Sequence, residues 1–366
     1  MSRIKLSARP LNLKLKHPFG ISRGSITYAK NVLITLNFGD IVAYGEAAPS
    51  SYYGEDQNTV IKFINDFVRE KSVEEYIANI HKLKDNLNYF SSNIFRLSAP
   101  SARAGLEMAF WDLIGKINNK SLYQYFFQDD DPFIENGNGF KSLSQTSYTI
   151  GLDDLLVIEK KVKEALSDGH KILKIKLGYG YEQDINILKK INEIMKDYSC
   201  VLRVDVNGGW DLETTEKMLD VLPSYKVELL EQPLPKGNVK LLSTICNKSP
   251  VPIFVDEDCM ISRDIESLAG KVHGINIKLM KSGSIIEALN MINLAKSYNL
   301  KIMLGCMIES SCAISAAVSL SPFANYIDLD GHLLLESDPF GGLSFQNNKI
   351  IPSFEPGLGV DLALSN

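Results

Sequence analysis

Eight short apolar runs, each typical of a β-strand, alternate with helical stretches through the second half of the chain. In order they read SYTIGL, KILKIKLG, VLRVDVN, VELLEQP, PIFVDED, GINIKL, KIMLGCM and YIDLD. Strict alternation of strand and helix predicts a parallel sheet. Eight units favour an α/β fold closed as a (β/α)8 barrel over residues 145–339, although such barrels are usually longer. An open doubly wound sheet is the alternative, but GLDDLL after the first run is not the Gly-rich phosphate loop usual in such sheets.

The first 130 residues have a different pattern, in which strands precede helices. Residues 4–45 alternate apolar and polar side chains, and a hairpin is predicted to turn at Gly39–Asp40. From about residue 58 to 127 the pattern is helical, most clearly in SARAGLEMAFWDLIGKI, where apolar residues follow a serine start at helical spacing. The polar stretch DDDPFIENGNGFKSLSQ is predicted to connect this region to the barrel.

Charge and cysteine content argue against several classes of protein. The net charge is −5 and no long basic run occurs, so neither nucleic acid nor an anionic membrane is an expected partner. The N-terminus lacks the apolar centre of a signal peptide, and no apolar run approaches a bilayer span. The five cysteines are scattered without a CxxC array, which argues against a disulfide framework and structural zinc. We expect a cytoplasmic protein; the oligomeric state stays open, a homo-oligomer included.

Charged residues recur at the ends of successive runs. Lys176, Asp205, Glu231, Asp256 and Lys281 follow one another at intervals of 29, 26, 25 and 25 residues, about one strand–helix unit each. Asp328 and Asp330 end the eighth run. In a barrel this position is the C-terminal rim, where active sites are built. The sequence therefore predicts that these side chains meet in one site.

Three of these residues are carboxylates on adjacent predicted strands. Asp205, Glu231 and Asp256 would repel one another unless a cation lay among them. Ligation by oxygen alone favours a hard ion, so we expect one Mg²⁺ per subunit. Zinc would require histidine or cysteine at these points. The alternative is that each acid pairs with a lysine or arginine of the barrel.

Two lysines face the acids from opposite sides of the predicted ring, Lys176 on the second strand and Lys281 after the sixth. A lysine acts as a base only when its pKa falls from about 10.4 to about 7–8, and burial, a neighbouring ammonium and Mg²⁺ all lower it. Lys174 shares a strand face with Lys176 and would supply that ammonium. A salt bridge inside the barrel is the alternative for Lys174, and Lys278 is expected to be a structural partner of the acids.

The motifs KIKLG, VDVNGGW, ELLEQP, VDED and NIKLMKSG, in this order and spacing, resemble the muconate-lactonizing-enzyme subgroup of the enolase superfamily. The resemblance implies an α+β capping domain over residues 1–130, completed by about 340–366. It implies Asp205, Glu231 and Asp256 as Mg²⁺ ligands and Lys176 and Lys281 as acid/base residues. By the same resemblance, Lys174 would help to hold the substrate carboxylate and would lower the pKa of Lys176.

Within this subgroup, the DxD of YIDLDG is similar to a motif of dipeptide epimerases. The resemblance implies that Asp328 and Asp330 bind the N-terminal ammonium of a dipeptide; a helix N-cap or a salt bridge to the capping domain is the alternative. Arg23 lies where the family has its specificity loop and would bind a substrate carboxylate bidentately, with a surface arginine as the alternative. Residues 50–57 would form a second lid segment, and Thr149 and Glu309 are further candidates for lining the site.

The expected reaction is epimerisation of a dipeptide, L-Ala-D/L-Glu or a related one, through an enediolate. Two bases on opposite faces of one carbon suit inversion at that carbon. o-Succinylbenzoate synthase and cycloisomerase activities are the alternatives within the subgroup, and neither substrate carries an ammonium. A non-catalytic metal-binding barrel is the alternative of another class, although it would be expected to lose some of the lysines and acids that are all present here. Ser284 replaces a family glycine and alters the expected loop after Lys281.

Overall fold

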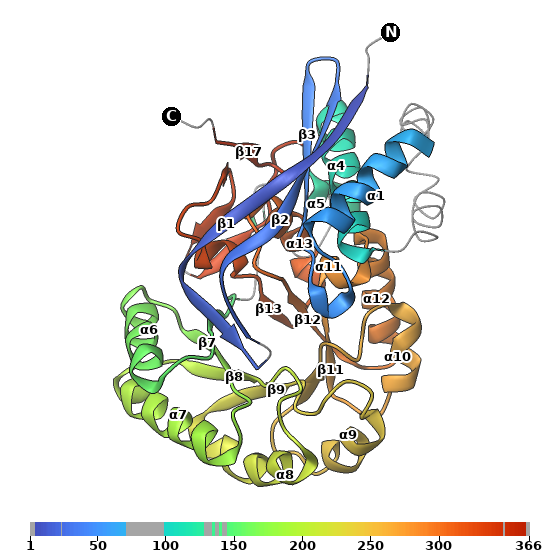
Figure 1. Cartoon of the computed structure of the whole chain (residues 1–366). Helices are drawn as coiled ribbons and strands as arrows, with labels where there is room; N and C mark the ends of the chain where they lie inside the picture. The colour runs from blue at the N-terminus through green and yellow to red at the C-terminus, as the bar shows by residue number, and fades with distance from the viewer. Residues whose placement is uncertain are drawn as a thin grey trace.

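The computed structural model describes residues 4–22, 24–70, 99–127, 134–135, 139–140, 145–346 and 348–363. Figure 1 shows a ring of strands and helices at its lower end, with a long antiparallel sheet and several helices above it. Within the described residues, no helix combines the length and the apolar character needed to cross a membrane.

Eight parallel strands form the ring and follow one another in chain order. They are β6 (Tyr148–Ile150), β7 (Ile172–Lys176), β8 (Val201–Asp205), β9 (Val227–Glu231), β10 (Ile253–Val255), β11 (Gly274–Ile277), β12 (Lys301–Gly305) and β13 (Tyr326–Asp328). A parallel bridge between Thr146 and Ile327 joins the last strand to the segment that leads into the first, which closes the sheet. The barrel predicted from the alternating runs is confirmed.

Helices cover the outside of this sheet, as Figure 1 shows most clearly for α6 to α10. They are α6 (Leu155–Ser167), α7 (Tyr181–Ile194), α8 (Leu212–Val221), α9 (Val239–Cys246), α10 (Ser262–Leu268), α12 (Ile285–Ser297) and α13 (Ser311–Val318). The period-two pattern of β7 explains its burial on both sides: Leu173 and Ile175 lie in the apolar core, while Lys174 and Lys176 meet carboxylates inside the ring. The short helix α11 (Leu279–Ser282) connects β11 to α12 and carries Lys281.

The N-terminal sheet consists of β1 (Lys5–Ile21), β2 (Gly24–Phe38) and β3 (Ile41–Ala47), all antiparallel. Its second hairpin turns at Gly39–Asp40 as predicted, because Phe38 pairs with Ile41. The helices α1 (Gln57–Glu70), α4 (Pro100–Asn118) and α5 (Leu122–Phe126) follow. On β3, Gly45 allows close packing against α4, since a Cβ added to it would lie only 2.0 Å from the Gly105 carbonyl oxygen.

Helix α4 begins differently from the sequence expectation. It starts at Pro100 rather than at the serine, and its N-cap residue Ala99 makes no side-chain cap hydrogen bond. The buried Glu55 carboxylate caps the helix instead, accepting hydrogen bonds from the Ser101 backbone N–H at 3.0 Å and the Ser101 hydroxyl at 2.9 Å. A negative charge at a helix N-terminus is stabilising because it satisfies free N–H groups and complements the helix dipole.

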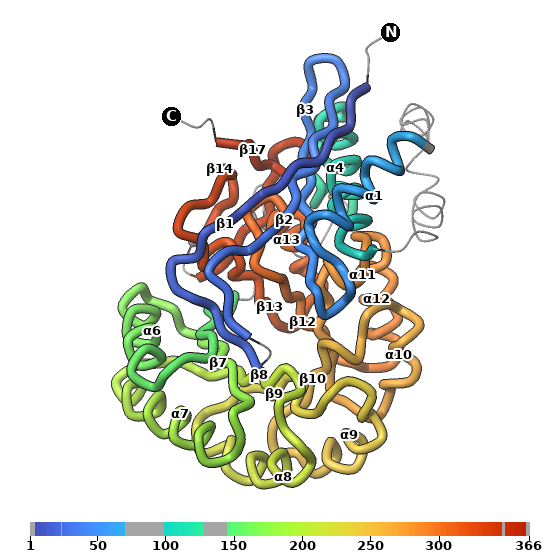
Figure 2. The backbone as a smooth tube through the Cα atoms, viewed as in Figure 1, coloured from blue at the N-terminus to red at the C-terminus, as the bar shows by residue number. Residues whose placement is uncertain are grey.

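The first hairpin of the N-terminal sheet reaches down to the barrel rim, as the tube in Figure 2 shows. Gly20 has no side chain to prevent this contact: its carbonyl accepts the Leu152 N–H at 2.8 Å, and a Cβ there would lie 2.2 Å from the Leu152 carbonyl oxygen. The chain ends in short strands, β14 (Phe340–Gly341), β15 (Ser344–Gln346), β16 (Lys349–Ile351) and β17 (Asp361–Leu362), while β4 (Ile134–Glu135) pairs with β5 (Gly139–Phe140). The C-terminal segment returns to α4, where the Leu358 N–H donates to Asp112 at 2.8 Å.

Candidate active site

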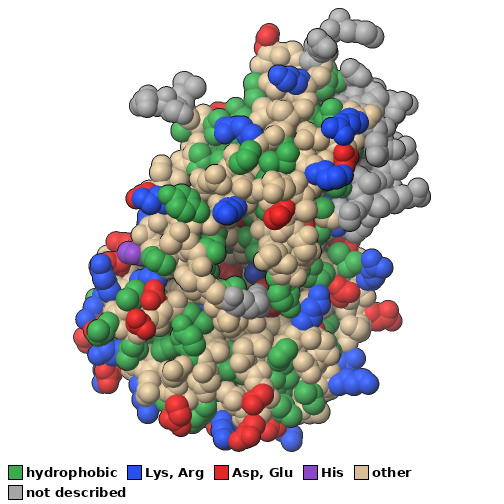
Figure 3. Space-filling model, in the orientation of Figure 1, with side chains coloured by type: hydrophobic (Ala, Val, Ile, Leu, Met, Phe, Trp, Pro, Cys, Tyr) green, Lys and Arg blue, Asp and Glu red, His purple; other side chains and the backbone are tan. Residues whose placement is uncertain are grey.

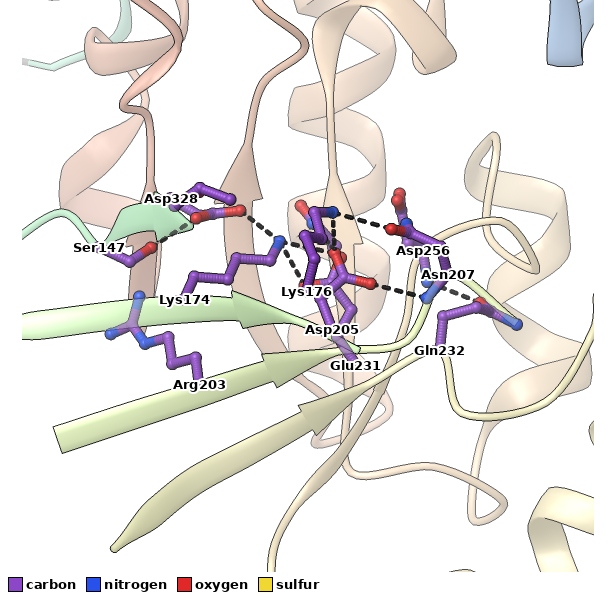
Figure 4. A network of polar contacts seen from close by, with 12 residues as sticks. Ser147, Lys174, Lys176, Arg203, Asp205, Asn207, Glu231, Gln232, Asp256 and Asp328 are labelled. Carbon is purple, nitrogen blue, oxygen red and sulfur yellow. Dashed lines mark hydrogen bonds and ion pairs between the residues drawn. The ribbon is translucent and has the colours of Figure 1, made fainter. Parts of the chain in front are cut away.

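The ends of the barrel strands converge on a cluster of buried charges, drawn in Figure 4. At its centre is Lys174, whose Nζ lies 2.6 Å from Asp328 Oδ2 and 2.7 Å from Glu231 Oε2. The same nitrogen is 3.0 Å from Asp205 Oδ2. Strands β7, β8, β9 and β13 thus bring one ammonium and three carboxylates together. Figure 3 shows a hollow in the centre of the viewed face, with acidic and basic side chains at its bottom.

Lys176 lies beside this centre, two residues further along β7 toward the rim. Its Nζ is 2.6 Å from Asp205 Oδ2 and 3.0 Å from the Asn207 side-chain oxygen. Asn207 is itself fixed, because its backbone N–H donates to Asp205 Oδ1 at 3.0 Å. The Ser22 hydroxyl of the first hairpin donates to the Asn207 carbonyl at 3.4 Å. The hairpin therefore contacts the loop that orients Lys176.

Lys281 lies on the opposite side of the ring. It follows β11, and β8, β9 and β10 separate β11 from β7, the strand of Lys176. The side chain of Lys281 is completely buried, and its Nζ is 2.6 Å from Asp256 Oδ1. Three backbone carbonyls also accept from this amine, at 2.6, 2.9 and 3.0 Å; they belong to Asp256, Asn276 and Cys259. Lys278 binds the other oxygen of Asp256 at 2.8 Å, as expected of a structural partner.

Electrostatics in the cluster follow from burial and these pairs. Burial would lower the pKa of Lys174, but the surrounding carboxylates raise it well above its ordinary value. Burial opposes ionisation of Asp205, yet Lys174 and Lys176 hold its pKa well below the usual range. Burial and then the Asp205 carboxylate raise the pKa of Glu231 to about 7. Among the three predicted metal ligands, Glu231 is thus the carboxylate whose negative charge the lysines compensate least.

The three predicted metal ligands are each paired with lysine, which is the alternative that the sequence left open. Within the described part of the chain, no group of three or more His, Cys, Asp or Glu side chains is arranged to hold a metal ion. The donors nevertheless fit a hard divalent cation. Glu231 Oε2 and Asp256 Oδ1 are buried within ion-pair distance of a lysine, but neither oxygen accepts a hydrogen bond from any residue that the structure describes. Each oxygen therefore keeps lone pairs for a cation, and Mg²⁺ would relieve the repulsion that raises the pKa of Glu231.

The two aspartates of the DxD sequence lie on the barrel and bind barrel groups. Asp328 accepts a hydrogen bond from the Ser147 hydroxyl at 2.5 Å besides pairing with Lys174. Asp330 Oδ2 accepts the Thr149 backbone N–H at 2.5 Å and makes no side-chain cap bond to the 3₁₀-helix that follows it. Burial and the Asp328 carboxylate raise the pKa of Asp330 to about 6. Among the described residues, Asp330 pairs with no lysine or arginine, so it has more capacity than Asp328 to bind a further cation.

The remaining predicted residues lie at different distances from the cluster. Arg23 falls outside the described residues. The segment 50–57 approaches the rim, since the Tyr53 phenol acts electrostatically on Lys278. Glu309 is buried after β12, and its carboxylate accepts the Met307 N–H at 2.9 Å. Burial and the nearby Glu46 of β3 raise the pKa of Glu309 to about 8.

Glu309 makes the stability of the protein depend on pH. Its folded-state pKa of about 8 exceeds the ordinary value of 4.5, so the folded protein keeps a proton that the unfolded chain releases between these values. The contribution to stability is present in full below about pH 4.5 and is lost as the pH rises through about 8. We expect the urea midpoint of the Glu309→Gln variant to fall less steeply than that of the wild type between pH 5 and 9. Parallel profiles would contradict this assignment.

The sequence matches two family descriptions that together span most of the chain. Residues 3–126 match the mandelate racemase/muconate lactonizing enzyme N-terminal domain, and residues 157–365 match the enolase C-terminal domain-like family. The chain belongs to the enolase superfamily. The predicted family resemblance is confirmed, and the barrel with its N-terminal antiparallel sheet is the architecture of its structural neighbours.

Several characterised members of the superfamily are similar over their whole length. A hydrophobic dipeptide epimerase from Roseobacter litoralis is 34% identical, with 97% of this chain and 98% of the relative covered. An L-Ala-D/L-Glu epimerase from Bacteroides thetaiotaomicron is 33% identical, with 98% of this chain and 88% of the relative covered. The crystal structure of a dipeptide epimerase from Enterococcus faecalis, complexed with Mg and L-Leu-L-Tyr, is 30% identical with a TM-score of 0.81, covering 98% and 99% of the two chains.

Several residues that orient the charged side chains of the site were not predicted from the sequence. Asn207 holds Lys176, and Asn276 Nδ2 donates to Glu231 Oε1 at 2.7 Å. Gln232 accepts the Asp256 N–H at 2.9 Å and donates to Asp258 at 2.7 Å. All three are uncharged amides within or next to the quoted motifs, so a search for charge alone passes over them. The signal that points to them is their position near a strand end: Gln232 and Asn207 lie one and two residues after it, and Asn276 lies one residue before it.

Proposed function

We propose that this protein is a Mg²⁺-dependent dipeptide epimerase, an isomerase that inverts one α-carbon by 1,1-proton transfer. The observation that carries the proposal is the placement of Lys176 and Lys281 on opposite sides of one cluster of buried carboxylates. Two bases that face each other across a substrate carbon suit removal of a proton from one face and its return to the other. Full-length relatives named as dipeptide epimerases support this reaction.

In the proposed mechanism, Lys176 and Lys281 exchange roles with the direction of the reaction. One lysine removes the α-proton of the C-terminal residue of the dipeptide, and the other, as an ammonium, protonates the opposite face. Asn207 and three backbone carbonyls keep the two amines in place. Lys174, held as a cation by its carboxylates, would stabilise the charge that develops on the substrate carboxylate in the enediolate. Bound by Asp205, Glu231 and Asp256, Mg²⁺ would supply further stabilisation of that charge.

The substrate would be oriented by its ammonium and its side chain. We propose that Asp330, with Asp328, binds the N-terminal ammonium, and that Thr149 and Glu309 line the site. The N-terminal region, residues 1–130 with 340–366, would act as a cap that sets side-chain preference over a barrel of residues 145–339, and Arg23 stays a predicted substrate contact in it. The relatives include both L-Ala-D/L-Glu and hydrophobic dipeptide epimerases. Both substrate types therefore belong in a first library.

We also propose a cytoplasmic enzyme whose partners are dipeptides rather than nucleic acid. All five cysteines are free thiols in the structure, which is typical of a reducing compartment. A net charge of −5 disfavours binding to a polyanion. A homo-oligomer is compatible with these features.

The proposed function is tested by isotope exchange. The protein with Mg²⁺ is incubated in D₂O with L-Ala-L-Glu, L-Ala-D-Glu and dipeptides with apolar C-terminal residues, and α-deuterium is followed by NMR. Incorporation together with epimer formation supports the proposal, and EDTA should stop both until Mg²⁺ is added back. No exchange with any dipeptide would reject it. Turnover of an o-succinylbenzoate precursor or of a muconate would instead identify one of the alternative activities. If no substrate is turned over, the non-catalytic metal-binding barrel is the remaining alternative.

Recognition of the ammonium makes a separate prediction about Asp330. Because a hydrogen bond to a charged group contributes roughly 1.5–3 kcal/mol, the Asp330→Asn variant should raise KM for free dipeptides by about 10- to 100-fold. N-acetyl dipeptides, which lack the ammonium, should be almost unaffected. The ratio of kcat/KM for the free and the acetylated substrate is the measurement. The exposed Glu336, paired with Lys14, offers a control as Glu336→Gln; an unchanged ratio in Asp330→Asn would contradict the assignment.

A further inference from the structure

Helix α4 of the N-terminal region contacts the segment that carries Lys281. We call residues 278–286 the Lys281 segment; it includes α11 and the first turn of α12. The Glu107 carboxylate accepts the Ile285 N–H at 3.1 Å through Oε2 and the Ile286 N–H at 3.3 Å through Oε1. The Ser284 hydroxyl caps the same helix start, accepting the Glu287 N–H at 2.8 Å. Glu107 thus binds the N-terminus of α12, which starts immediately after the Lys281 loop.

Two further contacts hold the same segment from the N-terminal region. Gly283 has a left-handed backbone with φ of 79°, and a Cβ there would lie 2.4 Å from the Arg103 guanidinium of α4. The Ala48 N–H, at the end of β3, donates to Met280 Sδ at 3.3 Å. The positions before and after Lys281 are therefore both contacted by the N-terminal region, whereas the described partners of the Lys281 amine itself are barrel groups.

Lys176 is held in a different way. It lies within β7, between β6 and β8, and its amine binds Asp205 and Asn207. The carboxylate of Glu107 makes its hydrogen bonds to the Lys281 segment and to the Trp111 indole N–H, at 3.0 Å. A change at Glu107 would consequently act on one lysine of the pair and leave the other in place.

We propose that Glu107 is a positioning residue for Lys281 and that it controls proton transfer at one face of the substrate α-carbon. The proposal rests on the epimerase function proposed above. A short connection between β11 and α12 carries Lys281, so a shift of the α12 N-terminus moves the lysine with it. A displacement of about 1 Å from the productive geometry is sufficient to cost roughly 100-fold in rate. The buried carboxylate of Glu107 is thus a link by which the N-terminal region sets the geometry of one base.

The Glu107→Gln variant tests this role because it keeps the side-chain shape but replaces one acceptor oxygen with a donor amide. Exchange of the α-proton in D₂O is measured separately from each epimer of the best dipeptide. We expect about a 10- to 100-fold fall for the epimer whose exchange is lost in Lys281→Ala. For the epimer whose exchange is lost in Lys176→Ala, the exchange rate should change by less than about threefold. A purely structural defect would instead lower the exchange rates of both epimers together.

Asp112→Asn is the matched control. Asp112 is also a buried carboxylate of α4 and also accepts backbone N–H groups, from Tyr44 and Leu358, but it does not bind the Lys281 segment. Ser284→Ala loosens the same start of α12 from the barrel side, because it removes the hydroxyl that accepts the Glu287 N–H, and it replaces Glu107→Gln if that variant does not fold. An equal fall for both epimers, or the same asymmetry in Asp112→Asn, would overturn the proposal. Absence of exchange in the wild type would instead reject the epimerase function itself.

Discussion

The Lys281→Ala variant is expected to lose α-proton exchange from one epimer of its dipeptide substrate and to keep it for the other. Lys281 and Lys176 lie on opposite sides of the ring, so in the proposed mechanism each would reach only one face of a bound α-carbon. General acid–base catalysis contributes roughly 10²–10⁴-fold, so epimerisation should fall by about that factor in either Lys281→Ala or Lys176→Ala. Exchange from each epimer in D₂O, followed by NMR, measures the two half-reactions separately.

The two lysine variants control each other, because they should spare opposite epimers. The half-buried Lys271, which precedes β11 at the other end of the strand from Lys281, provides a neutral control as Lys271→Ala. If both catalytic variants lost exchange of the same epimer, one lysine would be acting only through charge or structure. If both lost both epimers, the two-base mechanism would be rejected, although the barrel and the carboxylate cluster would be unaffected as structural findings.

The positions of the site residues were predictable because barrel geometry converts sequence period into spatial proximity. Each strand–helix unit returns the chain to the same rim, so charges spaced by about one unit, such as Asp205, Glu231 and Asp256, meet without any knowledge of distant contacts. Period two within β7 likewise places Lys174 and Lys176 on the inner face. These rules are local, and the structure confirms the fold class that they predicted from the sequence.

The contacts of these residues were not predictable, because they join segments far apart in the chain. Lys174 binds Asp328 across 154 positions, and Glu46 binds Ser310 across 264. The N-cap of α4 was misplaced for the same reason: its partner Glu55 belongs to an earlier segment, so the serine at position 101 resembles a local cap without being one. Buried amides such as Asn207 and Asn276 gain their roles only when neighbouring strands are aligned.

Asp256 should be one of the two most sensitive acids, because two functions meet on its carboxylate, as they also do on Asp205 beside Lys176. Asp256 is a proposed Mg²⁺ ligand, and it binds both Lys278 and Lys281. The Asp256→Asn variant removes one negative charge beside two ammonium groups and leaves a neutral amide as a weaker ligand. A charged interaction of several kcal/mol in the transition state corresponds to roughly a 10²–10³-fold loss of epimerisation. Weaker Mg²⁺ binding in calorimetry should accompany that loss.

A comparison with Glu228→Gln separates the site from general effects of removing a barrel carboxylate that is partly exposed. Glu228 lies near the start of β9, the strand that ends at Glu231. It pairs with Arg203 at 2.8 Å rather than with a lysine of the cluster. That variant should bind Mg²⁺ normally and keep its activity, even if its stability falls. Normal activity of Asp256→Asn at millimolar Mg²⁺ would contradict the metal assignment. Normal Mg²⁺ binding with lost activity would instead place the role of Asp256 in orienting Lys281, since the carboxylate and three carbonyls share that amine.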